Sequence, residues 1–156
     1  MKKYIILIPI YNDKESLIKL IENINLEVKN LNSQISIIVV NDASSQQVID
    51  NYQNIESIHS IKVINMKENR GHARCIASGL KYIFEKKEFD YVIPMDGDGE
   101  DRPEEIKNLI PRALPKYKFK LDELMAIFLF IVGIIPKFVK ILIKPTIDKK
   151  FRRLIH

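Results

Sequence analysis

Short apolar runs rich in β-branched residues alternate, over the first 110 residues, with segments whose apolar residues recur at helical spacing. The runs Lys3–Ile8 and Ile35–Val40 lack a polar face, which is typical of strands that are buried on both sides of a sheet. The predicted strands are Lys3–Ile8, Ile35–Val40, Ile61–Ile64 and Tyr91–Met95. Strands that alternate with helices in this way predict an α/β fold with a mainly parallel sheet flanked by helices.

The segments between the apolar runs predict the helices. Asn12 or Asp13 can cap the first helix, because a short polar side chain accepts hydrogen bonds from the free backbone N–H groups of a helix start. Pro103 suits the first turn of the last helix, where no backbone donor is needed. The later helices are predicted at Val48–Tyr52, His72–Phe84 and Glu104–Leu109.

Clusters of polar residues follow the predicted strands. In a parallel sheet the carboxyl ends of the strands lie at one edge, and ligands bind beyond that edge. We therefore expect four separate loops to form one site. The clusters are Tyr11-Asn12-Asp13, Asn41-Asp42, Asn69-Arg70-Gly71 and Asp96–Asp101.

The composition is that of an ordered globular chain, with 46% apolar and 29% charged residues. Cys75 is the single cysteine, so no internal disulfide can form, which fits a reducing compartment. The opening MKKYIILIPIYNDKES regains charge at Asp13 and shows no small-residue cleavage site, so we predict no signal peptide.

The net charge of +5 is unevenly distributed. Residues 111–156 hold 11 Lys or Arg against 3 Asp or Glu, whereas residues 1–110 hold 14 against 17. The basic balance therefore belongs to the C-terminal tail, and we do not interpret it as nucleic-acid binding by the body. We predict one domain over residues 1–110 and a separate tail over residues 111–156.

The tail contains the uncharged run LMAIFLFIVGII, Leu124–Ile135, which is 12 residues long. A spanning helix needs about 20 mostly apolar residues. The lysines and arginines that follow the run fit a helical hairpin or an interfacial helix on an anionic leaflet. A buried core helix with a basic end is the alternative. We predict an apolar, basic helical tail associated with the cytoplasmic face of a membrane.

The acidic segment MDGDGEDRPEE, which begins at Met95, has three interpretations. A charged run after a strand is most often a solvated loop. A calcium loop that starts at Asp96 requires glycine in sixth place and glutamate in twelfth, but Asp101 and Lys107 stand there, so this pattern fails. The third interpretation is a site for a divalent metal and a diphosphate.

Two aspartates separated by one small residue favour this third interpretation. Mg²⁺ and Mn²⁺ take oxygen ligands, usually one or two carboxylates together with substrate phosphates. Asp96 and Asp98 supply such carboxylates at the mouth of a strand. Gly97 and Gly99 are expected to take up positive φ and to let the backbone approach a bulky ligand. A bound metal would stabilise a departing nucleoside diphosphate.

Four motifs in this order and spacing, IPIYNDKES, VVNDAS, NRGHARCIASGL and MDGDGEDRPEEI, resemble the nucleotide-binding half of family-2 glycosyltransferases. The resemblance is to the polyprenol-phosphate branch, similar to dolichol-phosphate mannose synthase, and covers about residues 3–110. It implies a Rossmann-like GT-A domain that binds a nucleotide-diphosphate sugar together with Mg²⁺ or Mn²⁺. It also implies a lipid-phosphate or other membrane-linked acceptor and transfer with inversion.

The resemblance assigns roles to individual positions. Asp42 corresponds to the aspartate that contacts the base, and Asn41 stands where the family often has a second aspartate. Asp96 and Asp98 correspond to the Asp-x-Asp pair that serves catalysis and metal binding, with Glu100 as a further metal ligand. The resemblance also implies that Pro9, Tyr11 and Asp13 or Glu15 line the nucleoside pocket. It implies that Arg70 and Arg74 reach the diphosphate, and that Asp96 contacts the nucleotide-sugar as well as the metal.

Other assignments of the same residues stay open. Tyr11 is also explained as a strand-end aromatic, Asp42 as a turn former and Arg74 as a surface cation. His72 and Cys75 lack the partners of a zinc site and are predicted to be packing residues. A Rossmann oxidoreductase is excluded, because the first strand is followed by no Gly-x-Gly-x-x-Gly turn.

The resemblance fades after about Leu109, before any counterpart of the half that binds the acceptor. A lipid-phosphate acceptor is already ionised near neutral pH, so its transfer does not require a strong general base. The sequence therefore predicts a glycosyltransferase that acts on a membrane-linked acceptor. The alternative is a nucleotide-binding remnant or partner domain without catalysis.

Overall fold

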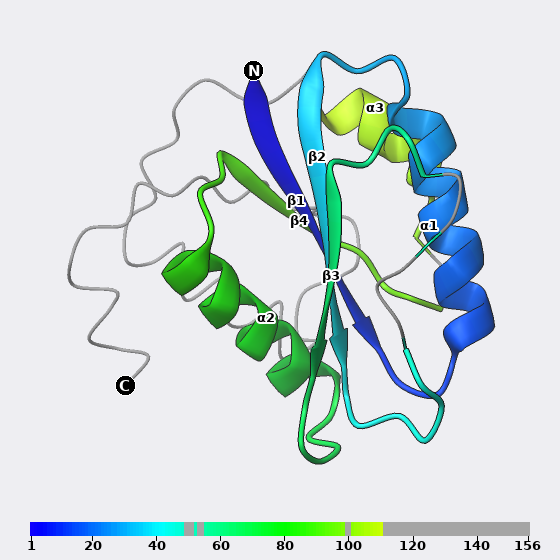
Figure 1. The fold of residues 1–156 in the computed structure, drawn as a ribbon, viewed down its shortest axis with the longest axis vertical. Helices are drawn as coiled ribbons and strands as arrows, with labels where there is room; N and C mark the ends of the chain where they lie inside the picture. Colours follow the sequence, from blue (N-terminus) through cyan, green and yellow to red (C-terminus); the bar gives the residue numbers. More distant parts are fainter. Residues whose placement is uncertain (49–51, 53–54, 99–100, 111–156) are drawn as a thin grey trace.

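The computed structural model describes residues 1–48, 52, 55–98 and 101–110 (Figure 1). In this part of the chain one sheet of four parallel strands runs in the order β3-β2-β1-β4. The predicted parallel sheet is confirmed, and each predicted strand is present with its ends within two residues of the prediction. The strands are β1 (Lys2–Ile10), β2 (Ser33–Asn41), β3 (Ser60–Asn65) and β4 (Tyr91–Pro94).

The helices cover both faces of the sheet, as the alternating pattern predicts. In Figure 1, α1 (Lys14–Val28) and α3 (Ile106–Leu109) lie on one side of the strands and α2 (His72–Lys86) lies on the other. The last helix begins as a 3₁₀ turn, η1 (Pro103–Glu105), because the Glu105 N–H donates to the Arg102 carbonyl, 3.1 Å away. The predicted helix at Val48–Tyr52 falls largely outside the described residues, and the predicted tail falls wholly outside them.

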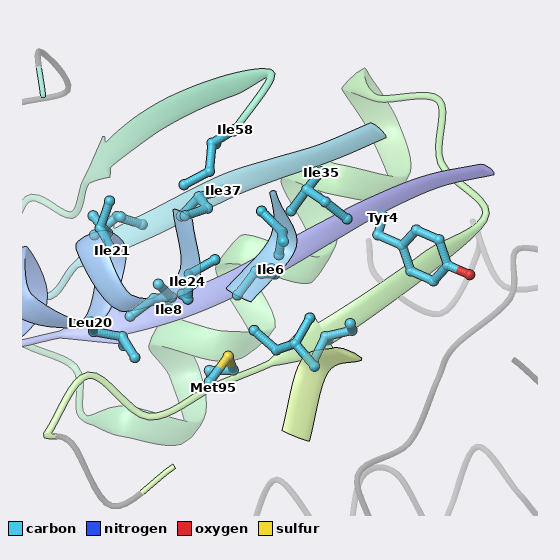
Figure 2. Close-up of a cluster of buried hydrophobic side chains, with 14 of the residues drawn as sticks. Tyr4, Ile6, Ile8, Leu20, Ile21, Ile24, Ile35, Ile37, Ile58 and Met95 are labelled. Atoms are coloured by element: carbon cyan, nitrogen blue, oxygen red, sulfur yellow. The ribbon is translucent and has the colours of Figure 1, made fainter. Parts of the chain in front are cut away.

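Alternate residues of β1 point to opposite layers, which divides the core in two. One set of its side chains, with Ile6 and Ile8 among them, packs against α1, while Ile5 and Leu7 pack against α2. Figure 2 shows the first cluster, in which β1, β2 and α1 bring their isoleucines together. Complete burial of one such side chain contributes about 1.5–3 kcal/mol. The two layers bury most of β1 and β2, whereas β3, at the edge of the sheet, is half-buried to exposed.

Tyr4 connects β1 to the end of α3. Its hydroxyl donates to the carbonyl of Ile110, 3.2 Å away, and its ring stacks on Tyr91 with centroids 5.1 Å apart. Burial raises the pKa of Tyr4 to about 12, so the hydroxyl stays a donor at neutral pH. This contact holds α3 over the α1 side of the sheet.

Gly79 brings α2 close to the sheet. A Cβ atom at this position would lie 2.4 Å from Cδ1 of Leu7 and 2.8 Å from Cγ2 of Val40, which is closer than real side chains approach. We expect Gly79→Ala to lower the free energy of unfolding by about 1 kcal/mol, because overpacking costs about 1–3 kcal/mol and the helix propensity of alanine returns about 1 kcal/mol.

Urea unfolding of the full chain measures this change. Lys81→Ala is the control, because Lys81 lies on the same helix and its side chain is partly exposed. A Gly79→Ala chain more stable than the parent would show that α2 does not pack this closely against Leu7 and Val40.

Within the described part of the chain, no helix has both the length and the apolar character needed to cross a bilayer.

Candidate functional site

The loops that follow β1, β2 and β3 lie together at the lower end of the sheet in Figure 1, where α1 and α2 also begin. Backbone hydrogen bonds join these loops beyond the strands. The Asp42 N–H donates to the Ile10 carbonyl, and the Met66 N–H donates to the Asn41 carbonyl, each over 2.9 Å. The predicted polar clusters are therefore neighbours in space, although they are far apart in the sequence.

Asp42 is 3% exposed and sits under the loop that leads into α2. Its Oδ1 accepts from the Arg70 N–H and its Oδ2 from the Gly71 N–H, both at 2.8 Å. Gly71 has φ 84°, a left-handed conformation that glycine adopts without strain. The buried charge is offset by these amides and by the positive end of α2. Asp42 thus shapes the start of α2, and its predicted contact with the base stays a prediction.

Asn41 braces β2 against β3. It is 5% exposed, its Nδ2 donates to Oδ1 of Asn65 at 2.8 Å, and its Oδ1 accepts from the Ser44 N–H at 3.0 Å. The side chain of an aspartate at this position has no N–H to donate to Asn65. The asparagine therefore has a structural reason of its own where the family often has an acid.

Asn12 joins the loop after β1 to the loop after β2. The backbone N–H of Asn12 donates to Oγ of Ser44 at 2.9 Å, and its Oδ1 accepts from the N–H of Ser45 at 2.8 Å. Asn12 and Ala43 both have positive φ, 52° and 56°. Tyr11, which precedes this junction, is 53% exposed, so its ring is accessible to a ligand.

Three of the predicted nucleotide contacts lie in β1 or at the start of α1. Asp13 rather than Asn12 caps the helix, since its Oδ1 accepts from the Ser16 N–H at 3.1 Å. Pro9 is buried in β1, and Glu15 is exposed in the first turn of α1. Their contacts with a nucleoside stay predictions.

The two predicted diphosphate contacts, Arg70 and Arg74, lie at the start of α2. Arg70 presents its backbone N–H to Asp42 and its guanidinium to Glu68, with which it forms an exposed ion pair. Arg74 is exposed in the first turn of α2. An exposed ion pair contributes little, so the guanidinium of Arg70 can exchange Glu68 for another anion at small cost.

The loop after β4 carries the predicted metal ligands. The backbone N–H of Asp96 donates to Oδ2 of Asp101 at 2.8 Å, which closes the loop on itself. The side chain of Asp96 is 35% exposed, and Asp98 is exposed. Glu100, the third predicted ligand, lies outside the described residues, as does Gly99.

Gly97 corrects one expectation. Unlike Gly71, Gly97 does not have positive φ. It is required for space instead, because a Cβ atom would lie 2.9 Å from the Pro9 carbonyl oxygen and 3.0 Å from Cδ1 of Ile10. The glycine between the two aspartates therefore lets the loop pack against the end of β1.

His72 was predicted to be a packing residue, and that prediction is wrong. It is the first residue of α2, its side chain is 56% exposed, and its Nε2 lies 3.4 Å from Oδ1 of Asp96. No local pattern relates these two residues, which the fold brings together from separate loops. A histidine at a helix start within a polar loop was the one available signal.

Cys75 is confirmed as a packing residue. It is fully buried, and its Sγ donates to the carbonyl of Val40 at 3.1 Å. Burial raises the pKa of this thiol to about 12, so it stays protonated at neutral pH.

The donor set suits a divalent cation in part. Within residues 1–48, 52, 55–98 and 101–110 no group of three His, Cys, Asp or Glu is placed to hold a metal by itself. Asp96 and Asp98 nevertheless present accessible carboxylates from one short loop. Hard cations such as Mg²⁺ and Mn²⁺ are commonly held by one or two carboxylates, with water and phosphate oxygens in the other positions.

The family model described as glycosyl transferase family 2 matches residues 5–126. A curated relative, the undecaprenyl-phosphate 4-deoxy-4-formamido-L-arabinose transferase of Proteus mirabilis (strain HI4320), is 33% identical over 120 residues. That alignment covers 75% of this chain and 35% of the relative, so the chain spans about a third of the length of that protein.

Solved structures share the fold. The crystal structure of residues 1–349 of S. aureus TarS superposes with a TM-score of 0.53 at 23% identity, and covers 70% of this chain and 31% of that one. The same fragment in complex with UDP-GlcNAc gives a TM-score of 0.52 at 24% identity, with 70% and 30% covered. The predicted fold class is confirmed.

Proposed function

Because this chain belongs to glycosyl transferase family 2, we propose that it transfers a sugar from a nucleotide-diphosphate sugar to a lipid-phosphate acceptor at a membrane. The observation that carries the proposal is the convergence of the strand-end loops on one edge of the sheet, with the exposed ring of Tyr11 and the exposed Asp98 among them. Two similar proteins add support. The Proteus mirabilis relative is named for an undecaprenyl-phosphate substrate, and S. aureus TarS was crystallised with UDP-GlcNAc.

The donor nucleotide would lie across this edge. Tyr11 offers an exposed aromatic face to the base, and Asp42 keeps a lone pair on each oxygen beside its two backbone hydrogen bonds. Arg74 lies in the first turn of α2, where the positive end of the helix dipole would stabilise the negative charge of the diphosphate. Asp96 and Asp98 would hold Mg²⁺ or Mn²⁺ with the diphosphate oxygens completing its shell.

The metal, when bound, offsets the diphosphate charge and makes the nucleoside diphosphate a better leaving group. An acceptor phosphate oxygen attacks the anomeric carbon from the opposite side while the bond between that carbon and the diphosphate oxygen breaks. This inverts the configuration of the carbon and releases the nucleoside diphosphate. This acceptor is ionised near neutral pH, so no side chain of the described site has to remove a strongly held proton. The basic apolar tail would hold the chain at the cytoplasmic face of the membrane that contains the acceptor.

A second candidate function is nucleotide-sugar binding without transfer, by a partner domain. The observation in its favour is that the chain spans 35% of the curated relative, so the relative's transfer activity rests on a longer chain. This candidate shares the donor site and lacks the lipid product.

Asp98→Ala tests the proposed function. Calorimetry of the full chain with a panel of nucleotide-sugars should show one donor that binds about tenfold more tightly with Mn²⁺ than without it, because the cation bridges carboxylate and diphosphate. Asp98→Ala should remove this metal-dependent gain. Glu22→Ala is the matched control, since Glu22 is an exposed carboxylate on α1 and should leave binding unchanged.

Turnover on polyprenyl phosphate in vesicles then separates the two candidates. Product formation that Asp98→Ala abolishes supports transfer, whereas metal-dependent binding without product supports the partner domain. Unchanged turnover and unchanged Mn²⁺-dependent binding in Asp98→Ala would refute the assigned donor site.

A further inference from the structure

We propose that the imidazole of His72 is a ligand of the divalent cation at Asp96, so that the site selects transition-metal dications over Mg²⁺ and Ca²⁺. The inference rests on the proposed function only in placing a metal at Asp96. It adds a nitrogen ligand, and with it a choice of metal, that the Asp-x-Asp pair alone does not supply.

The separation of the two side chains carries the first step. Nε2 of His72 and Oδ1 of Asp96 are 3.4 Å apart, beyond the distance of about 2.7–3.2 Å that an N–H···O hydrogen bond prefers. Two ligand atoms that each lie about 2.0–2.2 Å from one ion are roughly 3.0–3.5 Å apart, for octahedral to tetrahedral angles. The pair is therefore spaced as two ligands of one ion are spaced.

The backbones of both residues are fixed by the protein. The residue before His72 is held by the buried carboxylate of Asp42, which accepts the Gly71 N–H at 2.8 Å. Asp96 is held by Oδ2 of Asp101, also at 2.8 Å, and its neighbour Gly97 packs against the end of β1. An ion that binds between the two side chains thus meets ligands whose main chains do not have to move.

Both side chains are also accessible to an ion from solution. His72 is 56% exposed and Asp96 is 35% exposed. Asp98, two residues further along the same loop, is exposed, but it does not complete a group of three ligands with His72 and Asp96. Since the described residues contain no complete group of three protein ligands, water or phosphate oxygens fill the remaining positions.

The ligand types decide which metal is preferred. Carboxylate and water suit Mg²⁺, Ca²⁺ and Mn²⁺, whereas imidazole suits Zn²⁺ and the later transition metals. A site with one imidazole and one carboxylate therefore favours Co²⁺ and Zn²⁺ over Mg²⁺, and accepts Mn²⁺.

Titration of the full chain with Co²⁺ alone, without nucleotide, tests the inference. The visible absorption of Co²⁺ reports nitrogen ligation, and competition by Mg²⁺ reports selectivity. We expect His72→Ala and His72→Gln each to weaken Co²⁺ binding by about tenfold or more and to leave Mg²⁺ binding within about twofold, because only the transition metal gains from imidazole. His59→Ala is the matched control, since His59 is exposed and precedes β3 at the opposite end of that strand.

Each of the other possible outcomes contradicts a stated part of the inference. If His72→Gln binds Co²⁺ as the parent does, the side chain only positions Asp96 by hydrogen bonding, and the ligand assignment is wrong. If both His72 variants keep the parental preference for Co²⁺ over Mg²⁺ while Asp96→Asn loses Co²⁺, His72 is not a ligand and the metal site of the proposed function stands. If Asp96→Asn also binds Co²⁺ as the parent does, the metal site itself is wrongly placed.

Discussion

Asp42→Ala is expected to lower the free energy of unfolding by about 3 kcal/mol, because it removes a buried carboxylate that accepts two backbone hydrogen bonds. The Arg70 N–H is then left without this acceptor beneath the loop, while the Gly71 N–H keeps only Oδ1 of Asn69, 3.1 Å away. Hydrogen bonds to a charged group contribute about 1.5–3 kcal/mol each, and this second acceptor reduces the total. Urea unfolding measures the change.

Asp42→Asn refines the same prediction. The asparagine amide can accept from one of the two N–H groups, but its own NH₂ then faces the other donor. We therefore expect a loss comparable to that of Asp42→Ala rather than an intermediate one. Asp13→Ala is the matched control, since Asp13 accepts a single amide hydrogen bond as a helix cap. This substitution should lower the free energy of unfolding by about 1 kcal/mol. Equal losses for Asp13→Ala and Asp42→Ala would show that the loop does not depend on Asp42.

Gly97→Ala is expected to weaken metal-dependent donor binding by about tenfold to a hundredfold. The added Cβ atom meets the Pro9 carbonyl oxygen at 2.9 Å, a backbone atom that cannot rotate away. The loop must then move off the end of β1 and carry Asp96 and Asp98 with it. A displacement of about 1 Å in a positioned group can cost a hundredfold in rate, so turnover should fall at least as far as binding.

The double variant Ile10→Val with Gly97→Ala identifies the cause. Valine removes Cδ1 of Ile10, the atom 3.0 Å from the added Cβ, but leaves the Pro9 carbonyl in place. We expect little recovery of donor binding, measured by calorimetry with Mn²⁺, and Ile10→Val alone serves as the control. Full recovery in the double variant would mean that the side chain of Ile10, and not the backbone of β1, sets the position of the loop.

The strands and the order of the loops were predictable because their signals are local. A run such as Ile35–Val40 has no polar face, so it can lie only in the interior of a sheet, and the structure places β2 there between β1 and β3. The parallel arrangement follows from the helices that separate the strands, and it brings the polar loops to one edge. The proximity of the polar loops was therefore predictable from the pattern alone.

The roles of single residues at that edge were less predictable. Gly97 was expected to take up positive φ, but its requirement comes from Pro9 and Ile10 on another strand. His72 was expected to pack in the core, but it lies beside Asp96. In both cases the deciding neighbour is distant in sequence, and periodicity contains no information about such neighbours.

The sequence by itself determined the α/β class, the edge at which the polar loops meet and the glycosyltransferase family, because hydrophobic periodicity and motif spacing are properties of the chain. Only the tertiary structure decided what the polar residues there do. It placed the carboxylate of Asp42 against two backbone amides, and it set His72 3.4 Å from Asp96. The physical reason is that these contacts join residues of separate loops. They form only after the aligned strands have brought the loops together.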